Sequence, residues 1–235
     1  MEDQKRVDEA GEESLMSAGM NAAFAAEDER SSKILVMRHG QTEFNLDHRF
    51  LGCVDAPLTK LGEEQSRAAV AGLVAWKPDR IITSPLLRAR VAIAVPAARE
   101  LGVECIVDDR IKEFDFGPLE GMAVDEAIAA GLPFPWGETA SSWPPAGGGE
   151  TMPHFLARAA EAAHEYERLK GRTAVIAHGG MMRALFSAWL GLDVEKFNHF
   201  IVDNVRSYIF RAQPGFVALE HASVEPDLLE RYVAE

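Results

Sequence analysis

The chain has 235 residues, enough for one sizeable core, and at the usual ~100–200 residues per domain a single domain is expected. Hydrophobic residues make up 47% and charged residues 26%, a balance that argues neither for disorder nor for a membrane protein. No apolar stretch approaches the ~20 residues that cross a bilayer, because Arg183 and Ser187 interrupt the run over residues 181–192. The net charge of −13 argues against nucleic acid as a partner, since phosphate backbones are bound by clustered Lys and Arg.

The first 32 residues form an acidic extension, with nine acidic and three basic side chains. They contain too little apolar surface to offset the entropy of ordering, so a disordered tail is predicted. Residues 15–26 are rich in alanine, but the acidic segment before them is unlike the basic start of a secretory signal. A cytoplasmic protein without a membrane partner is therefore expected.

Cysteine is sparse in this sequence. Only Cys53 and Cys105 are present, and they lack the CxxC spacing of metal-binding or redox motifs. Two buried free thiols are expected, with neither a disulfide framework nor a zinc site.

From residue 33 onward, apolar runs of strand length alternate with segments of helical spacing. The predicted strands are residues 33–37, 80–83, 104–107 and 173–177, followed by a terminal hairpin of residues 206–211 and 216–219. The predicted helices are residues 62–75, 87–101 and 152–169. This alternation predicts one α/β domain over residues 33–235, built on a mainly parallel sheet.

An insertion over residues 122–152 interrupts the alternation. Four prolines and the run 147–149 of three glycines break any long element, and the segment contains no Lys or Arg. We predict a mobile lid. Its aromatic residues Phe134, Trp136 and Trp143 would either give a pocket apolar or stacking character or only pack the lid down.

Two predicted strands end at a histidine followed by glycine. Residues 33–37 run into Arg38-His39-Gly40, and residues 173–177 run into His178-Gly179-Gly180. Ligands of parallel α/β sheets bind beyond the carboxyl ends of the strands, so the two histidines are expected to meet. Either histidine alone would more often be a hydrogen-bonded structural residue, and the glycines have a structural explanation in tight turns or close backbone approach.

The residues around these histidines form four ordered blocks. The first runs from Arg38-His39-Gly40-Gln41-Thr42-Glu43-Phe44-Asn45 through Arg49-Phe50-Leu51-Gly52 to residues 55–65; the others are Ser84-Pro85-Leu86-Leu87-Arg88-Ala89, Glu113-Phe114-Asp115-Phe116-Gly117 with Leu119-Glu120-Gly121, and Ala177-His178-Gly179-Gly180. Together they resemble the histidine phosphatase, or phosphoglycerate mutase-like, superfamily over about residues 34–192. Four ordered blocks are far more specific than the tripeptide RHG. The resemblance implies a three-layer α/β/α sandwich with a mostly parallel sheet.

The resemblance also implies roles for four of these residues. His39 would attack phosphorus as a neutral imidazole and form a phosphohistidine, which splits one difficult displacement into two. Arg38 and Arg88 would supply planar, permanently charged forks that cradle the phosphoryl oxygens. His178 would bind a phosphoryl oxygen across the pocket, and it would serve best as a cation.

The leaving alkoxide needs a proton, and Glu113 matches the acid position of the family. The same carboxylate would later deprotonate the attacking water. Asp115 and Glu120 lie close by in the sequence and remain alternatives for this role.

Three further residues are candidates for the phosphate site. Asn45 would donate to phosphate or orient its loop, and the structural alternative is a turn or capping residue. Thr42 would either cap a turn or contact phosphate. Gly179 would lend a backbone N–H.

Hydrolysis is favoured over mutase activity because donors for a second anionic group are missing. Leu51 and Gly180 stand where the mutase pattern has Ser and Asn, and the insertion lacks basic residues. We therefore expect a metal-independent phosphomonoesterase, without a cofactor, that acts on a small phosphorylated metabolite.

Other functions remain open at this point. Phosphoglycerate mutase-type transfer is one alternative, and a non-catalytic phosphate-binding module is another. A metal hydrolase is weaker, because no HxH, HExxH or paired-Asp spacing accompanies the histidines. The sequence leaves the oligomeric state open, a homodimer included.

Overall fold

The computed structural model describes residues 32–135, 143–144, 148–193 and 199–233. Residues Ser32–Glu235 form one compact unit. The acidic extension that was predicted to be disordered lies outside the described residues, except for Ser32. No helix in the described ranges is both long enough and apolar enough to cross a membrane.

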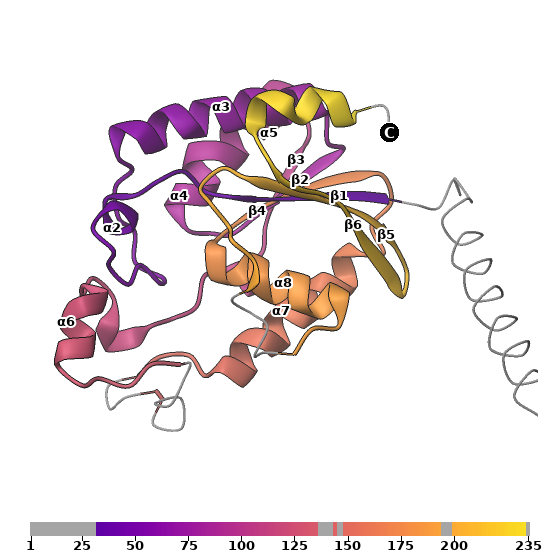
Figure 1. The fold of residues 1–235 in the computed structure, drawn as a ribbon. Coiled ribbons are helices and arrows are strands. Elements are labelled where there is room, and N and C mark those ends of the chain that lie inside the picture. The colour runs from indigo at the N-terminus through magenta and orange to yellow at the C-terminus, as the bar shows by residue number, and fades with distance from the viewer. Residues whose placement is uncertain (1–31, 136–142, 145–147, 194–198, 234–235) are drawn as a thin grey trace, which may run out of the picture. The chain divides into compact units, whose positions relative to one another are not determined.

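A six-stranded sheet runs through the domain in the order β3-β2-β4-β1-β5-β6 (Figure 1). The strands are β1 (Ser32–Arg38), β2 (Arg80–Thr83), β3 (Glu104–Val107), β4 (Arg172–Ala177), β5 (Ser207–Gln213) and β6 (Phe216–Val224). The first four pair in parallel, and β5 and β6 add an antiparallel hairpin beside β1. The mostly parallel α/β sheet and every predicted strand are confirmed, although β6 runs five residues further than the predicted 216–219.

Helices cover both faces of the sheet, which gives the predicted three layers (Figure 1). One face carries α3 (Lys60–Trp76), α5 (Val95–Leu101) and the 3-10 segment η6 (Pro226–Tyr232), and the other carries α7 (Met152–Tyr166) and α8 (Gly179–Leu190). The central strand β1 shows why: Leu35 and Met37 pack on the first face, while Ile34 and Val36 pack on the second. All four are fully buried, as expected for a parallel strand covered on both sides.

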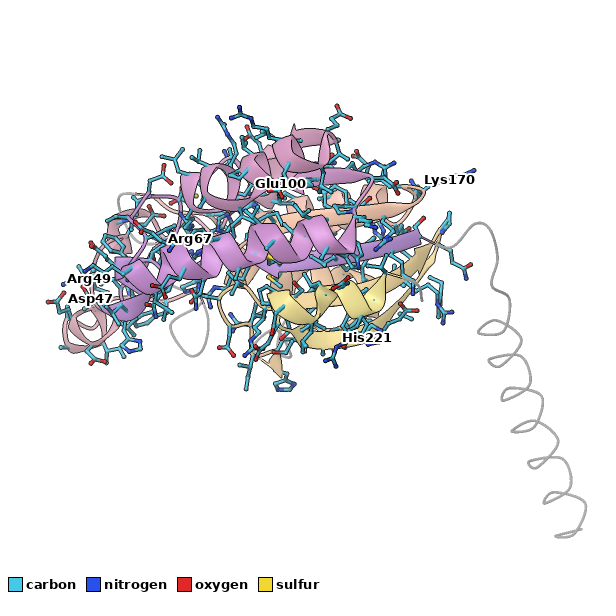
Figure 2. All side chains as sticks on the ribbon, turned by 90° about the horizontal axis from the view of Figure 1, so that it is seen from above. Asp47, Arg49, Arg67, Glu100, Lys170 and His221 are labelled. Carbon is cyan, nitrogen blue, oxygen red and sulfur yellow. The ribbon has the colours of Figure 1, made fainter. Side chains whose placement is uncertain are left out.

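Figure 2 shows α3 and η6 side by side across the first face of the sheet. It also separates the two ends of the sheet. Asp47 and Arg49 lie at the end where the parallel strands finish, and Lys170, which precedes β4, lies at the opposite end. His39 and His178 follow β1 and β4 at the first of these ends.

The predicted helix over residues 87–101 is continuous but changes its winding. It starts as α4 (Leu87–Ala89), widens into a π-helical turn η1 (Arg90–Ala94), in which the Val95 N–H bonds to the Arg90 carbonyl, and continues as α5. Pro96 has no N–H for the carbonyl four residues earlier, and the wider turn comes directly before it.

The insertion over residues 122–152 contains a short helix that the sequence did not predict, α6 (Val124–Ala129). Its Ala127 is buried in a small cluster with Phe50 and Leu119, and Phe134 packs against this cluster. The Trp143 ring lies 6.0 Å from that of Phe114, and its Nε1–H donates to the Glu150 carbonyl at 2.7 Å. The two described aromatic residues of the insertion thus pack inward, while Trp136 lies outside the described residues.

Helix α8 and the segment η6 were not among the predicted elements. Three short helical segments complete the described domain, and the sequence did not predict them as elements either. These are α2 (Glu43–Leu46), η2 (Asp109–Ile111) and η3 (Gly117–Leu119). Helix α7 begins at the predicted residue 152 and ends three residues before the predicted end.

Candidate active site

Three neighbouring parallel strands deliver polar side chains to one edge of the sheet. The registers pair Arg38 of β1 with Ala177 of β4, and Thr83 of β2 with Ile176 of β4. The next residues along the chain are His39, His178 and Ser84, so they leave the sheet together. The rings of His39 and His178 lie 5.2 Å apart between centroids, which confirms that the two motifs meet.

His39 is held in a single tautomer. Its ring is buried, and Nδ1 lies 2.7 Å from the Gly40 carbonyl oxygen, which can only accept, so Nδ1 carries the proton. The other nitrogen, Nε2, keeps its lone pair and accepts from Arg88 Nε at 3.3 Å. Burial and the charges of Arg88 and Arg38 hold the pKa of His39 well below its usual range. His39 is therefore a neutral imidazole whose unprotonated nitrogen is Nε2.

Arg88, on α4, is anchored by two backbone carbonyls. Its Nη1 donates to Val54 at 2.9 Å and its Nη2 to Gly52 at 2.7 Å, which leaves Nε facing His39. Burial lowers the pKa of Arg88 to about 10, so the guanidinium is still charged at neutral pH. The anchored fork fixes this charge beside the His39 ring.

Arg38 approaches the same place from the end of β1. Its Nη1 donates to the Val202 carbonyl at 2.6 Å, while its buried Nε has no hydrogen-bond partner among the described residues. Burial lowers the pKa of Arg38, against the opposing charge of Glu113. A buried cationic donor without a partner is costly, so an anion bound here would be strongly favoured.

His178 is positioned by Ser84, a residue to which the sequence assigned no role. The His178 Nε2 lies 2.6 Å from Ser84 Oγ, and Ser84 Oγ also accepts from the Leu86 N–H at 3.3 Å. In the arrangement in which the Ser84 hydroxyl donates to His178 Nε2, the ring proton is on Nδ1. That Nδ1 is buried and has no partner in the described part of the chain.

The sequence analysis expects His178 to serve best as a cation, whereas the surroundings of the ring favour its neutral form. Burial, together with the charges of Arg88 and Arg38, holds the pKa of His178 well below its usual range. A neutral ring with the proton on Nδ1 still presents one N–H donor to the pocket, so a phosphoryl oxygen can be bound without the charge.

The Glu113 carboxylate lies at the N-terminus of α8, the helix that begins immediately after His178. Its Oε2 accepts from the Gly180 N–H at 2.9 Å, and its Oε1 accepts from Met181 at 3.1 Å and from Phe114 at 3.0 Å. Helix N-termini attract anions because their first N–H groups have no partner within the helix. This contact brings Glu113 next to the His178 motif, 65 residues away in the sequence.

The two alternative carboxylates, Asp115 and Glu120, accept hydrogen bonds from backbone N–H groups of nearby loops. Asp115 accepts from the Gly117 N–H at 2.7 Å. Glu120 accepts from the N–H groups of Cys53 at 2.7 Å and Val54 at 3.1 Å, in the loop whose carbonyls anchor Arg88. Of the three carboxylates, only Glu113 is bound to the helix that follows His178.

Both cysteines are free thiols, but they are half-buried rather than buried as the sequence predicted. Burial raises the pKa of Cys53 to about 12, so its thiol is protonated at neutral pH. Its Sγ donates to the Glu113 carbonyl oxygen at 3.4 Å.

Asn45 and Thr42 form a capping box at the start of α2. The Thr42 hydroxyl accepts from the Asn45 N–H, and Asn45 Oδ1 accepts from the Thr42 N–H, both at 3.2 Å. The structural alternative given above for these residues is therefore realised. Asn204 Nδ2 donates to the His39 carbonyl at 2.9 Å and lies 3.4 Å from Asn45 Oδ1, so it joins this box to the His39 backbone.

The glycines after the two histidines differ in what requires them. A Cβ on Gly40 would lie 2.5 Å from the Gly62 carbonyl oxygen, so close backbone approach excludes a side chain there. A Cβ on Gly179 would have its nearest neighbour at 3.5 Å, in Arg38, which is an ordinary contact. At Gly180, by contrast, a Cβ would lie 2.5 Å from Glu113 Oε1.

The chain belongs to the histidine phosphatase superfamily (branch 1), whose family model matches residues 34–224. A glucosyl-3-phosphoglycerate phosphatase of Mycolicibacterium vanbaalenii is 33% identical over 179 residues, which cover 72% of this chain and 78% of the relative. A 2,3-bisphosphoglycerate-dependent phosphoglycerate mutase of Brucella melitensis is 33% identical over 184 residues, which cover 71% and 85%.

The fold is shared with solved structures. A mycobacterial glucosyl-3-phosphoglycerate phosphatase in complex with VO3 superimposes with a TM-score of 0.70 at 26% identity, covering 82% of this chain and 99% of that one. The predicted fold, and the prediction of a phosphatase of this superfamily, are confirmed.

Proposed function

We propose that the chain hydrolyses a small phosphomonoester through a phosphohistidine on His39, without a metal ion. The observation that carries this proposal is the state of the His39 ring. Its Nδ1–H is bound to Gly40, and burial together with the charges of Arg88 and Arg38 keeps Nε2 unprotonated, so a nucleophilic lone pair is present beside two cations. A nucleophile needs no separate base when its lone pair carries no proton.

The groups around Nε2 suit a phosphoryl group. Arg88 on α4, Arg38 at the end of β1 and His178 after β4 all lie near His39, and Nε of Arg38 and Nδ1 of His178 are buried without partners in the described chain. Charge-assisted hydrogen bonds to phosphoryl oxygens contribute roughly 1.5–3 kcal/mol each where water is excluded. Because the donors are held by the fold before substrate arrives, little reorganisation is needed in the transition state.

Glu113 is proposed as the acid and base, with Oε2 as the atom that carries the proton. Oε1 accepts two hydrogen bonds and so uses both of its lone pairs, whereas Oε2 accepts one, from Gly180. The remaining lone pair of Oε2 can hold a proton while the other contacts persist.

The proposed reaction has two steps, and every proton and bond is accounted for in each. His39 Nε2 attacks phosphorus, the bond from phosphorus to the ester oxygen breaks, and the proton on Glu113 passes to the leaving oxygen. In the second step Glu113 takes a proton from water, the water oxygen attacks phosphorus, and the phosphorus–nitrogen bond breaks. Inorganic phosphate leaves, and both residues return to their starting states.

Hydrolysis rather than mutase-type transfer is supported by what stands where a second anion would be held. Leu51 is apolar and buried, and Gly180 leaves no room for an asparagine unless Glu113 moves. The insertion over residues 122–152 has no basic side chain. Mutase activity remains the second candidate, because a mutase is among the relatives.

The names of the relatives suggest which substrates to try. They include phosphatases of glucosyl-3-phosphoglycerate, sedoheptulose 1,7-bisphosphate and phosphoserine. A panel of these esters, with 3-phosphoglycerate for mutase activity, is incubated with the full chain in the presence of a chelator, and free phosphate is measured. Release of phosphate that His39→Ala abolishes supports the proposal. Phosphate release lost on chelation, isomerisation without release, or turnover by His39→Ala would each contradict it.

A further inference from the structure

We propose that the ion pair between Glu150 and Arg158 positions the acid Glu113 and ties it to the end of the insertion over residues 122–152. The inference rests on the proposed function, since it concerns the residue that protonates the leaving group. Arg158 lies on α7, and neither member of the pair touches His39, Arg88 or His178. Both are positioning residues.

Arg158 uses all five of its N–H donors. Its Nη1 donates to the carbonyls of Arg110 at 2.5 Å and Lys112 at 2.6 Å, and its Nη2 donates to the Glu113 carbonyl at 3.0 Å. The two remaining donors, on Nε and Nη2, each bind a Glu150 oxygen at 2.7 Å. Only a planar fork with five donors can hold three carbonyls and a carboxylate at once, so lysine cannot replace it.

Glu150 continues the connection from the other side. Its backbone N–H donates to the Asp115 carbonyl at 2.9 Å, and its Oε2 accepts from the Asp115 N–H at 3.4 Å. Burial raises the pKa of the Glu150 carboxyl, but the hydrogen bond and charge of Arg158 outweigh it and lower the pKa overall. Its carbonyl also accepts from the indole of Trp143, inside the insertion.

Glu113 is thereby fixed from two directions. Its carbonyl is bound from behind by Arg158, and its carboxylate is bound in front by the N-terminus of α8. The free lone pair on Oε2 keeps its direction only if the backbone behind it is fixed. A shift of about 1 Å in a reacting group can reduce the rate by ~10² even when the group itself is intact.

A neighbouring ion-pair cluster offers a matched control. Arg110 also links the segment before Glu113 to α7, through Glu165 at 2.8 Å and Glu161 at 3.4 Å, and it pairs with Asp108 of its own segment at 2.6 Å. Its side chain pairs with Asp108, Glu161 and Glu165 and not with Glu113. Arg110→Gln therefore removes a comparable set of surface pairs without loosening the acid.

The test compares leaving groups. Wild type, Arg158→Lys, Glu150→Gln, Glu113→Gln and Arg110→Gln are assayed on p-nitrophenyl phosphate, which scarcely needs protonation, and on the best alkyl phosphate of the panel. We expect Arg158→Lys and Glu150→Gln to lose ~10–10² in kcat on the alkyl ester and under ~3-fold on the aryl ester. In the double variant Arg158→Lys with Glu113→Gln, the alkyl rate should fall no further than in Glu113→Gln alone, because both act through one proton. Arg110→Gln should match the wild type on both esters.

Equal losses on both esters, additive losses in the double variant, or unchanged rates would overturn the inference. Glu150→Gln keeps the packing and removes the charge, so it carries the test if Arg158→Lys does not fold. Failure of the proposed function looks different: the wild type releases no phosphate, or Glu113→Gln loses equally on both esters. If Glu113→Gln loses activity mainly on the alkyl ester but Arg158→Lys does not, the positioning role of Arg158 is refuted and the proposed function stands.

Discussion

Two neutral histidines in one buried site should make the domain sensitive to mild acid. His39 and His178 are 1% and 0% exposed, and burial with the neighbouring arginines holds both pKa values well below the usual range. In the unfolded chain each ring would titrate near the ordinary value of about 6.5. As the pH falls below about 6.5, the histidines of the unfolded chain bind protons that those of the folded chain do not bind. The free energy of unfolding is therefore highest above that pH and decreases below it.

The direction of these two shifts sets an upper limit, which is reached if neither ring takes up a proton in the folded chain. Each histidine lowers the free energy of unfolding by about 1.4 kcal/mol per pH unit once the pH is well below 6.5. Between pH 7.5 and pH 5.0 this limit is about 2 kcal/mol for one ring and about 4 kcal/mol for both. Single domains are typically stable by only ~5–15 kcal/mol, so the loss is easily measured.

The assay is urea unfolding at several pH values from 7.5 to 5.0, followed by tryptophan fluorescence. His39→Gln and His178→Gln should each lose less stability than the wild type over this range, by up to about 2 kcal/mol, and the double variant by up to about 4 kcal/mol. Carboxylates such as Asp108 and Glu150 are common to all four proteins, so their contribution cancels in the comparison. If all four proteins lost the same stability between these pH values, the two buried rings would not be neutral, and the reasoning about the nucleophile would be refuted.

Three further substitutions separate the parts of the site. Gly180→Ala places a Cβ 2.5 Å from Glu113 Oε1, so we expect kcat on alkyl phosphates to fall ~10-fold or more while urea stability is unchanged or higher. Ser84→Ala removes the hydroxyl beside His178 Nε2, and an unmade buried hydrogen bond should lower the unfolding free energy by about 1–3 kcal/mol together with kcat. Arg88→Lys removes the planar fork that is anchored on two carbonyls. The loss of one charge-assisted bond of ~1.5–3 kcal/mol should lower kcat/KM by ~10–150-fold, equally on alkyl and aryl esters.

Each of these expectations has a clear opposite. A Gly180→Ala enzyme as fast as the wild type would remove Glu113 from the acid role. Unchanged stability and turnover in Ser84→Ala would show that His178 needs no orientation. A loss in Arg88→Lys confined to alkyl esters would mean that this arginine acts on the leaving group rather than on the phosphoryl oxygens.

Much of the fold could be predicted from the sequence because strands and helices leave local patterns of apolar residues. The continuous apolar runs at 33–37 and 173–177 mark strands buried on both faces, and both were found where predicted. Parallel strands bring their carboxyl ends to one edge, so the meeting of His39 and His178 followed from two short motifs. Helix α6 was missed because its six residues stand among prolines and glycines, and its Ala127 is stabilised by packing against Phe50 rather than by helical propensity.

The parts of the site that were missed depend on contacts between distant segments. The neutrality of His178 depends on its burial and on Arg88, 90 residues earlier, neither of which is visible in the sequence around it. Ser84 lies at a strand end inside a motif that was noticed, and the rule that placed the histidines could have pointed to it. Asn204 and the pair Glu150–Arg158 gave no such signal, because they act on backbone atoms of other segments.

The central claim, that His39 carries the phosphoryl group, is tested most directly by trapping the intermediate. Wild type, His39→Ala and Glu113→Gln are mixed with an excess of an activated aryl phosphate, quenched in alkali within milliseconds, and digested for mass spectrometry of the peptide that contains residue 39. We expect one phosphoryl group, labile to acid and stable to base, on His39 of the wild type, more of it in Glu113→Gln, and none in His39→Ala. Turnover of the ester with no phosphoryl group on His39 in either the wild type or Glu113→Gln, or a phosphoryl group on another residue, would contradict the account.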